Sequence, residues 1–201
     1  MMKFVSLNVA ILALVASTVS SPAGGLSEAH PQNCTWCHGV SAQGYAPAPR
    51  LAGQGPLYIE NQLLSFRTHR RDNPFSKQYM WGAAANLSAG EAHYLATYFS
   101  SLTAKPADDG DMQKVAAGKA LFEDGNPSAN TVACAVCHGP NAQGIRDIPR
   151  LGGLSSAYLK RRLEQWKQGY HAAAKSPMPR IARTLSADQI ESVAAYLSFV
   201  K

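Results

Sequence analysis

The chain has few aromatic residues, few charges and only four cysteines. Phe, Trp and Tyr make up 8% of its 201 residues, and Asp, Glu, Lys and Arg make up 16%. Lean aromatic content means that two small domains built from this chain alone would have small hydrophobic cores. No dense run of Lys and Arg with interleaved aromatics accompanies the net charge of +6, so we do not expect the protein to bind nucleic acid.

The sequence also lacks an apolar run long enough to cross a membrane. Residues 4–16 are mostly apolar, but Asn8 interrupts them and a bilayer needs roughly 20 such residues. Lys3 precedes this run and small residues follow it, which is typical of a secretory signal peptide. We expect residues 1–23 to be a signal peptide, cleaved after Ala23, and the mature protein to be soluble outside the cytoplasm.

The four cysteines form two copies of the motif Cys-x-x-Cys-His, at residues 34–38 and 134–138. In this motif both thiols add across haem vinyl groups, and the histidine supplies an axial nitrogen to the iron. Two disulfides would leave the histidines unexplained, and a four-cysteine zinc site needs no histidine after each second cysteine. A thioredoxin-type redox pair needs a strand–helix context, which is missing. We therefore expect two covalently bound haem c groups. The predicted thioether residues are Cys34, Cys37, Cys134 and Cys137, and the predicted axial histidines are His38 and His138.

The repeat extends well beyond the two motifs. At an offset of 100 residues, Ala42-Gln43-Gly44 matches Ala142-Gln143-Gly144, and Pro49-Arg50-Leu51 matches Pro149-Arg150-Leu151. Near the end of each half the offset falls to 98, where Met80 pairs with Met178. The chain is therefore a tandem duplication of one haem-binding unit.

The element pattern predicts an all-α fold with two tandem domains and long loops that wrap the haem groups. Helices are expected over residues 56–68, 114–123 and 155–169, and each half ends in a helix that begins with a capping box. Gly118 would let the final helix approach closely, with Phe122 packed beside it. We expect domains over residues 24–101 and 112–201, joined by a Pro-, Gly- and Asp-containing linker over residues 102–111.

The sixth ligand of each iron separates an electron carrier from an enzyme, because a Met thioether opposite His closes the iron to peroxide and oxygen. Met80 and Met178 stand at duplicate positions, and we predict both as axial ligands. Met112 has no counterpart. His69 and His171 are the rival ligands, but neither has a counterpart at the duplicate position. We therefore expect these two, together with His30 and His93, to lie at the surface.

Residues around the ligands are also predicted. A metal-bound histidine usually donates its other N–H to a carbonyl, which Pro49 and Pro149 could supply. Arg50 and Arg150 either pair with haem propionates or lie solvated at the surface. Three aromatic residues, Tyr58, Tyr158 and Trp166, are expected to pack rather than bind ligand. The first domain, with few residues before Cys34, is expected to be less stable or to rely on its neighbour.

The doubled Cys-x-x-Cys-His-Gly, Gln-Gly and Pro-Arg-Leu-x-Gly runs, each followed by a late Met and a capped helix, resemble the dihaem cytochrome c4 family. The resemblance implies two class I cytochrome c domains with their haems close to a pseudo-twofold interface. It also implies a periplasmic electron carrier, loosely associated with the membrane, that takes electrons from a cytochrome bc1-type donor and passes them toward a terminal oxidase. Leu154 stands where the first domain has Gln54, which is a departure from that family.

These observations predict a one-electron carrier in a respiratory chain and not an enzyme. Alternatives are a cytochrome subunit of a periplasmic dehydrogenase and, with less support, a dihaem redox enzyme. Four haem propionates would nearly cancel the positive charge of the mature chain, so the basic composition does not require a polyanionic partner.

Overall fold

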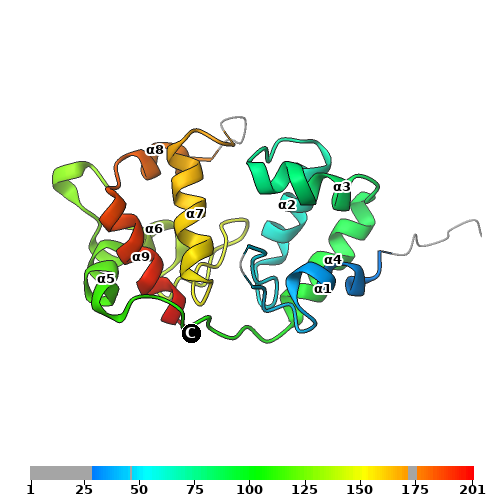
Figure 1. Ribbon diagram of the computed structural model, residues 1–201, viewed down its shortest axis with the longest axis horizontal. Coiled ribbons are helices and arrows are strands. Elements are labelled where there is room, and N and C mark those ends of the chain that lie inside the picture. The colour runs from blue at the N-terminus through cyan, green and yellow to red at the C-terminus, as the bar shows by residue number, and fades with distance from the viewer. Residues whose placement is uncertain (1–28, 46, 172–175) are drawn as a thin grey trace, which may run out of the picture.

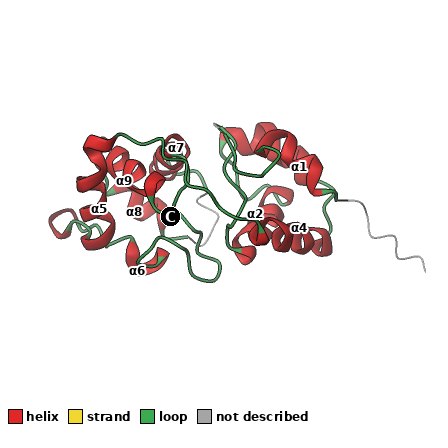
Figure 2. Cartoon of the chain, turned by 90° about the horizontal axis from the view of Figure 1, so that it is seen from below, coloured by secondary structure: helices red, strands yellow, loops and turns green. Residues whose placement is uncertain are grey.

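The computed structural model describes residues 29–45, 47–171 and 176–201, and the predicted signal peptide lies outside these ranges (Figure 1). The described residues form helices, loops and a few isolated β-bridges, with no strand among them, which confirms the all-α fold. Two groups of helices lie side by side and are joined by an extended segment (Figure 2). No helix in the described ranges is long and apolar enough to cross a membrane.

The first domain is built around the packing of α2 on α4. Its elements are α1 (Pro31–His38), α2 (Pro56–Arg67), the π-helical turn η1 (Ser76–Met80), α3 (Trp81–Ala84) and α4 (Ala89–Ser101). A proline in the first turn starts both α1 and α2, where its missing N–H has no helical partner to lose. Ile59, Leu95 and Phe99 form the centre of the buried core.

The second domain repeats this plan and adds a helix in front of it. Its elements are η2 (Met112–Lys114), α5 (Val115–Asp124), η3 (Pro127–Ala129), α6 (Ala135–His138), α7 (Ser156–Lys167), α8 (Met178–Arg183) and α9 (Ala187–Phe199). Helix α9 packs against both α5 and α7. A side chain at Gly118 would overlap the backbone of Ser192, and the rings of Phe122 and Tyr196 lie 5.7 Å apart. The predicted close approach of α5 to the final helix is thus confirmed.

Both predicted capping boxes are present. The Ser88 hydroxyl accepts a hydrogen bond from the Glu91 N–H, while the Glu91 carboxylate accepts from the Ser88 N–H. Ser186 and Gln189 make the same reciprocal pair at the start of α9. Each pair satisfies two N–H groups that would otherwise have no partner at the helix start, which fixes where the last helix of each domain begins.

The two domains are held together by buried polar contacts near the extended segment. Arg50 donates from Nη1 to the carbonyls of Lys105 (2.6 Å) and Gly153 (2.7 Å), and from Nη2 to that of Gly152 (2.7 Å). Gln54 completes the contact by bonding both the N–H and the carbonyl of Arg150. Both side chains are buried. The first domain therefore reaches into the second through its own Pro-Arg-Leu-x-Gly-Gln run.

Candidate haem sites

Each Cys-x-x-Cys-His motif lies on a short helix, α1 in the first domain and α6 in the second. All four thiols are free, which removes the two-disulfide alternative, and the two pairs lie in different domains, which removes a shared four-cysteine zinc site. Burial raises the pKa of the Cys34 thiol and raises that of Cys134 to about 11. A free thiol is the group that adds to a haem vinyl to form a thioether.

Both motif histidines are buried and held by the carbonyls that the sequence predicted. Nδ1 of His38 lies 2.7 Å from the Pro49 oxygen, and Nδ1 of His138 lies 2.9 Å from the Pro149 oxygen. Because a carbonyl only accepts, Nδ1 carries the proton and Nε2 keeps its lone pair for a metal. Burial also lowers the pKa of both imidazoles, which keeps them neutral.

A repeated turn places each proline carbonyl opposite its histidine. The Leu51 N–H donates to the Ala42 carbonyl and the Gly44 N–H to that of His38, and the same two bonds recur from Leu151 and Gly144. Gly44 has φ of 76°, and a side chain there would overlap the backbone of Pro49 and Arg50. Only glycine fits this position, which explains the Gln-Gly element in both halves.

The two methionines occupy different local structures. Met80 is half-buried at the end of the π-helical turn, a feature that often marks functional positions. Met178 is half-buried as the first residue of α8, with Pro177 at the cap. In Figure 1 the η1–α3 segment and α8 both lie along the upper edge of their domains, and α1 and α6 lie below them. Met112, by contrast, is exposed.

The surface prediction holds for three of the four remaining histidines. His30, His69 and His93 are exposed, and His69 stacks on Trp81 with the ring centroids 3.9 Å apart. The prediction is wrong for His171, which is only 3% exposed. Its Nε2 lies 2.9 Å from Asn73 Nδ2 and 3.2 Å from Arg162 Nη1. The backbone N–H of His171 donates to the Asp72 carboxylate. These contacts place His171 at the domain boundary.

The structure contradicts the solvated-surface alternative for the two repeat arginines. Arg50 is buried and uses its guanidinium on backbone carbonyls between the domains, as described above. Burial lowers its pKa to about 10, and the nearby positive charge of Arg150 adds to the shift. Arg150 is half-buried and donates from Nε to the Gly152 carbonyl at 3.1 Å. Neither side chain is a solvated surface arginine, and both bind backbone.

Sequence reasoning missed a second group of buried arginines, at the boundary where α2 and α7 face each other. Arg71 is 8% exposed and Arg162 is 9% exposed, yet neither pairs with a carboxylate of the described residues. Arg71 donates to the Tyr158 hydroxyl at 3.3 Å, and its Nε has no hydrogen-bond partner. We call Arg71, Arg162, Tyr58, Tyr158 and His171 the arginine cluster.

The two arginines of the cluster come from different places in the repeat. Gln62 corresponds to Arg162, whereas Arg71 lies where the two halves differ in length, so each domain supplies one arginine from a different site. Arg71 donates to Gln62, whereas Arg162 bonds His171. Each guanidinium also stacks on the equivalent ring, Arg71 over Phe66 at 4.7 Å and Arg162 over Trp166 at 5.0 Å. In the sequence, the visible signal was Arg162 at the position where the first domain has Gln62.

The charges in the cluster shift the pKa values of its neighbours. Burial lowers the pKa of His171 to about 2, and the charges of Arg162 and Arg71 act in the same direction. Burial opposes ionisation of Tyr158, but Arg71 and Arg162 outweigh it and lower the pKa of that phenol. A buried cationic cluster of this kind is costly unless an anion accompanies it. Its unpaired Nε and two phenols suit a carboxylate acceptor.

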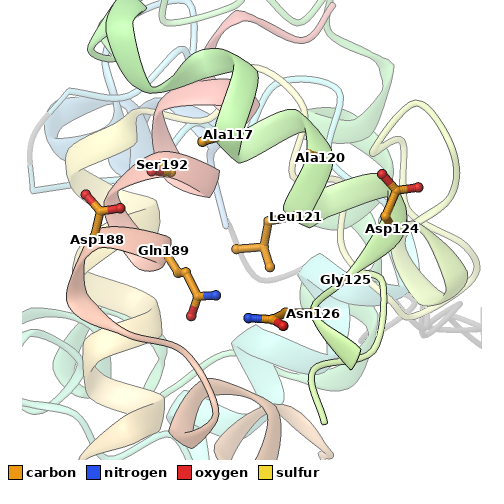
Figure 3. A pocket seen from close by; sticks show the side chains of 9 residues that line it. All are labelled: Ala117, Ala120, Leu121, Asp124, Gly125, Asn126, Asp188, Gln189 and Ser192. Atoms are coloured by element: carbon orange, nitrogen blue, oxygen red, sulfur yellow. The ribbon is translucent and has the colours of Figure 1, made fainter. Parts of the chain in front are cut away.

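The residues present fit two haem c groups. Each domain offers two free thiols, one oriented neutral imidazole and one thioether, and the boundary offers unpaired guanidinium donors for haem carboxylates. A separate hollow of about 430 Å³ lies between α5 and α9, bordered by Asp124, Asp188 and Gln189 (Figure 3). It contains none of the predicted haem residues, so we assign it no part in haem binding.

Two all-helical domains, each with this motif and a proline carbonyl holding the motif histidine, define the class I cytochromes c. The cytochrome c family model matches residues 27–103 and 115–201. The chain belongs to the cytochrome c family. It is a dihaem, cytochrome c4-like electron carrier with two covalently bound haem c groups.

Three known proteins show the extent of the likeness. Cytochrome c-552 of Acidithiobacillus ferridurans is 33% identical over 195 residues, covering 93% of this chain and 84% of its own. The thiosulfate dehydrogenase electron acceptor of Stutzerimonas stutzeri strain A1501 is 36% identical over 176 residues, covering 83% of this chain and 78% of its own. The solved cytochrome c4 of Acidithiobacillus ferrooxidans superposes with a TM-score of 0.77 at 32% identity, covering 83% of this chain and 98% of its own.

Proposed function

We propose that this protein is a periplasmic one-electron carrier in a respiratory chain and delivers electrons toward a terminal oxidase, without catalysis of its own. The observation that carries the proposal is the duplicated ligand set, in which a neutral histidine and a methionine occur at matching places in both domains. Export by residues 1–23 would place the carrier in the periplasm. Its donor would be a cytochrome bc1-type complex or another periplasmic oxidoreductase, since one relative is named as the electron acceptor of a thiosulfate dehydrogenase.

We assign one ligand set to each domain, taking residues 24–101 and 112–201 as the domains and 102–111 as the linker. In the first, Cys34 and Cys37 would attach the haem, and His38 and Met80 would bind the iron. In the second, Cys134, Cys137, His138 and Met178 would do the same. The haem iron supplies the one-electron couple. The chain's part would be to keep each histidine oriented through Pro49 or Pro149, to supply a methionine sulfur to the iron, and to hold haem carboxylates near Arg71 and Arg162.

Two measurements test this proposal. The ferric absorption spectrum is expected to show the long-wavelength band of Met sulfur bound to iron, at a strength that corresponds to two haems. A band of half that strength would contradict one methionine assignment, and its absence would contradict both. The reduced protein is also expected to be oxidised by a detergent-solubilised cbb3-type oxidase, and this oxidation is measured as oxygen uptake. Failure of that oxidation would contradict delivery toward such an oxidase.

A further inference from the structure

Three exposed apolar side chains lie beside the first haem-attachment motif, and two of them are the most exposed large apolar side chains of the described residues. Val40 is 95% exposed, Trp36 is 82% exposed and Tyr45 is 54% exposed. Trp36 lies between the two cysteines of the motif, and Val40 follows its histidine by two residues. A tryptophan left this open to water is unusual, because burying its ring would remove a large apolar area from solvent. We call Trp36, Val40 and Tyr45 the uncharged face.

The uncharged face is held in shape by its own residues. The Tyr45 hydroxyl donates to the Trp36 carbonyl at 2.9 Å, which ties the loop after α1 back onto that helix. Trp36, Val40 and Tyr45, with Thr35 and Gly39, border a shallow hollow of about 380 Å³. An apolar side chain of another protein can bind in a hollow that is bordered by exposed aromatic rings.

Charge is missing from this part of the chain. No Asp, Glu, Lys or Arg occurs from Pro31 to Pro49. In the second domain, the corresponding segment carries Arg146 and Asp147, both exposed, and smaller residues replace the rings, with Val136 at the place of Trp36 and Ile145 at that of Tyr45. The face is thus a property of the first domain and not of the repeated unit.

We propose that the uncharged face is where the redox partner docks, and that this partner presents an apolar face without net charge around its own cofactor. The inference rests on the proposed carrier function and names the surface through which it acts. A partner seated there lies directly against the residues proposed to attach the first haem, so electrons enter or leave through the first domain. Because the segment carries no charge of its own to steer a partner, association is expected to depend less on ionic strength than charge-steered docking does.

Electron self-exchange tests this surface without a foreign partner, because two copies can meet through the same uncharged face. The rate is measured in mixtures of ferrous and ferric holoprotein, from the broadening of haem methyl resonances. Trp36→Glu is expected to slow exchange by about tenfold or more, since it places a charge in a desolvated contact. Val136→Glu, the matched change in the second domain, is expected to leave the rate within about twofold of the parent, a small change on the free-energy scale.

Two further measurements separate the possible outcomes. Val40→Glu repeats the test at a second exposed position, and the midpoint potentials of all variants are expected to match the parent. Parent-like exchange in both Trp36→Glu and Val40→Glu, or equal slowing by Val136→Glu, would overturn the proposal. A steep fall of the parent's self-exchange rate with added salt would contradict an uncharged contact. Oxidation by the cbb3-type oxidase tests the carrier function separately, because its failure leaves the self-exchange result standing.

Discussion

The two domains share the loop that orients the axial histidine but differ in what covers their last helix. In the second domain, α9 packs against α5 through Gly118 and Phe122. In the first, none of the described elements takes the place of α5, and Tyr94 and Tyr98 of α4 are 53% and 37% exposed. The difference shows that the repeat preserves the ligand geometry, while the packing around it is free to vary between the copies.

The largest effect is expected from removing one haem at a time. Cys34→Ala with Cys37→Ala, and Cys134→Ala with Cys137→Ala, are each expected to halve the haem content in a pyridine haemochrome assay. The first pair is expected to lose more helical signal by circular dichroism, because the first domain has the smaller protein core and depends more on its cofactor. Greater loss from the second pair would reverse our ranking of the two domains.

Gly118→Ala tests the helix contact that only the second domain has. The new methyl group would meet the Ser192 carbonyl and Tyr196, and overpacking of this kind costs about 3 kcal/mol. Gly90→Ala is the matched control on α4, where a side chain meets nothing within 4 Å. The free energy of unfolding in urea is expected to fall for Gly118→Ala and to change little for Gly90→Ala. Equal free energies of unfolding for the two variants would show that α5 and α9 can move apart without loss of stability.

Arg71→Gln tests whether the arginine cluster serves both domains. Loss of a buried positive charge favours ferric iron, so both midpoint potentials are expected to fall, by roughly 60 mV for a tenfold change in a one-electron equilibrium. Arg70→Gln removes the same charge from the exposed neighbouring position and is expected to leave both potentials within experimental error. Unchanged potentials in Arg71→Gln would mean that the cluster only supports the fold. Arg71→Lys keeps the positive charge without the guanidinium, so it distinguishes an effect of charge from an effect of side-chain shape.

His171 gives the boundary a predictable dependence on pH. Its pKa of about 2 in the folded protein lies below the ordinary value of 6.5, so below about pH 6.5 the unfolded chain binds a proton that the folded chain does not. Stability is therefore expected to fall as pH falls, by up to about 2 kcal/mol at pH 5. His171→Gln is expected to flatten this slope in urea titrations at several pH values, whereas the exposed control His30→Gln is expected to retain it. An equal slope in the parent and His171→Gln would contradict the assignment.

Features that depend on short sequence patterns could be predicted without the structure. The cysteine motifs, the capping boxes at Ser88 and Ser186, and the Pro49 and Pro149 carbonyls follow from local spacing, and the structure confirms the boxes and the carbonyls. Features that depend on how the domains meet could not. Arg50 and His171 have ordinary local sequences, and only the opposing domain decides that they are buried. One indication of that boundary in the sequence was Gln54, which bonds Arg150 and is replaced by Leu154 in the second copy.

The contacts of Arg50 affect how electrons can pass between the two domains. A single guanidinium bound to three carbonyls, two of them in the other domain, keeps the two halves from sliding or swinging apart. Two haems bound in these domains would be held at a fixed separation, and electron transfer between them would need no movement of the domains. The two one-electron centres would then act together as a store for two electrons.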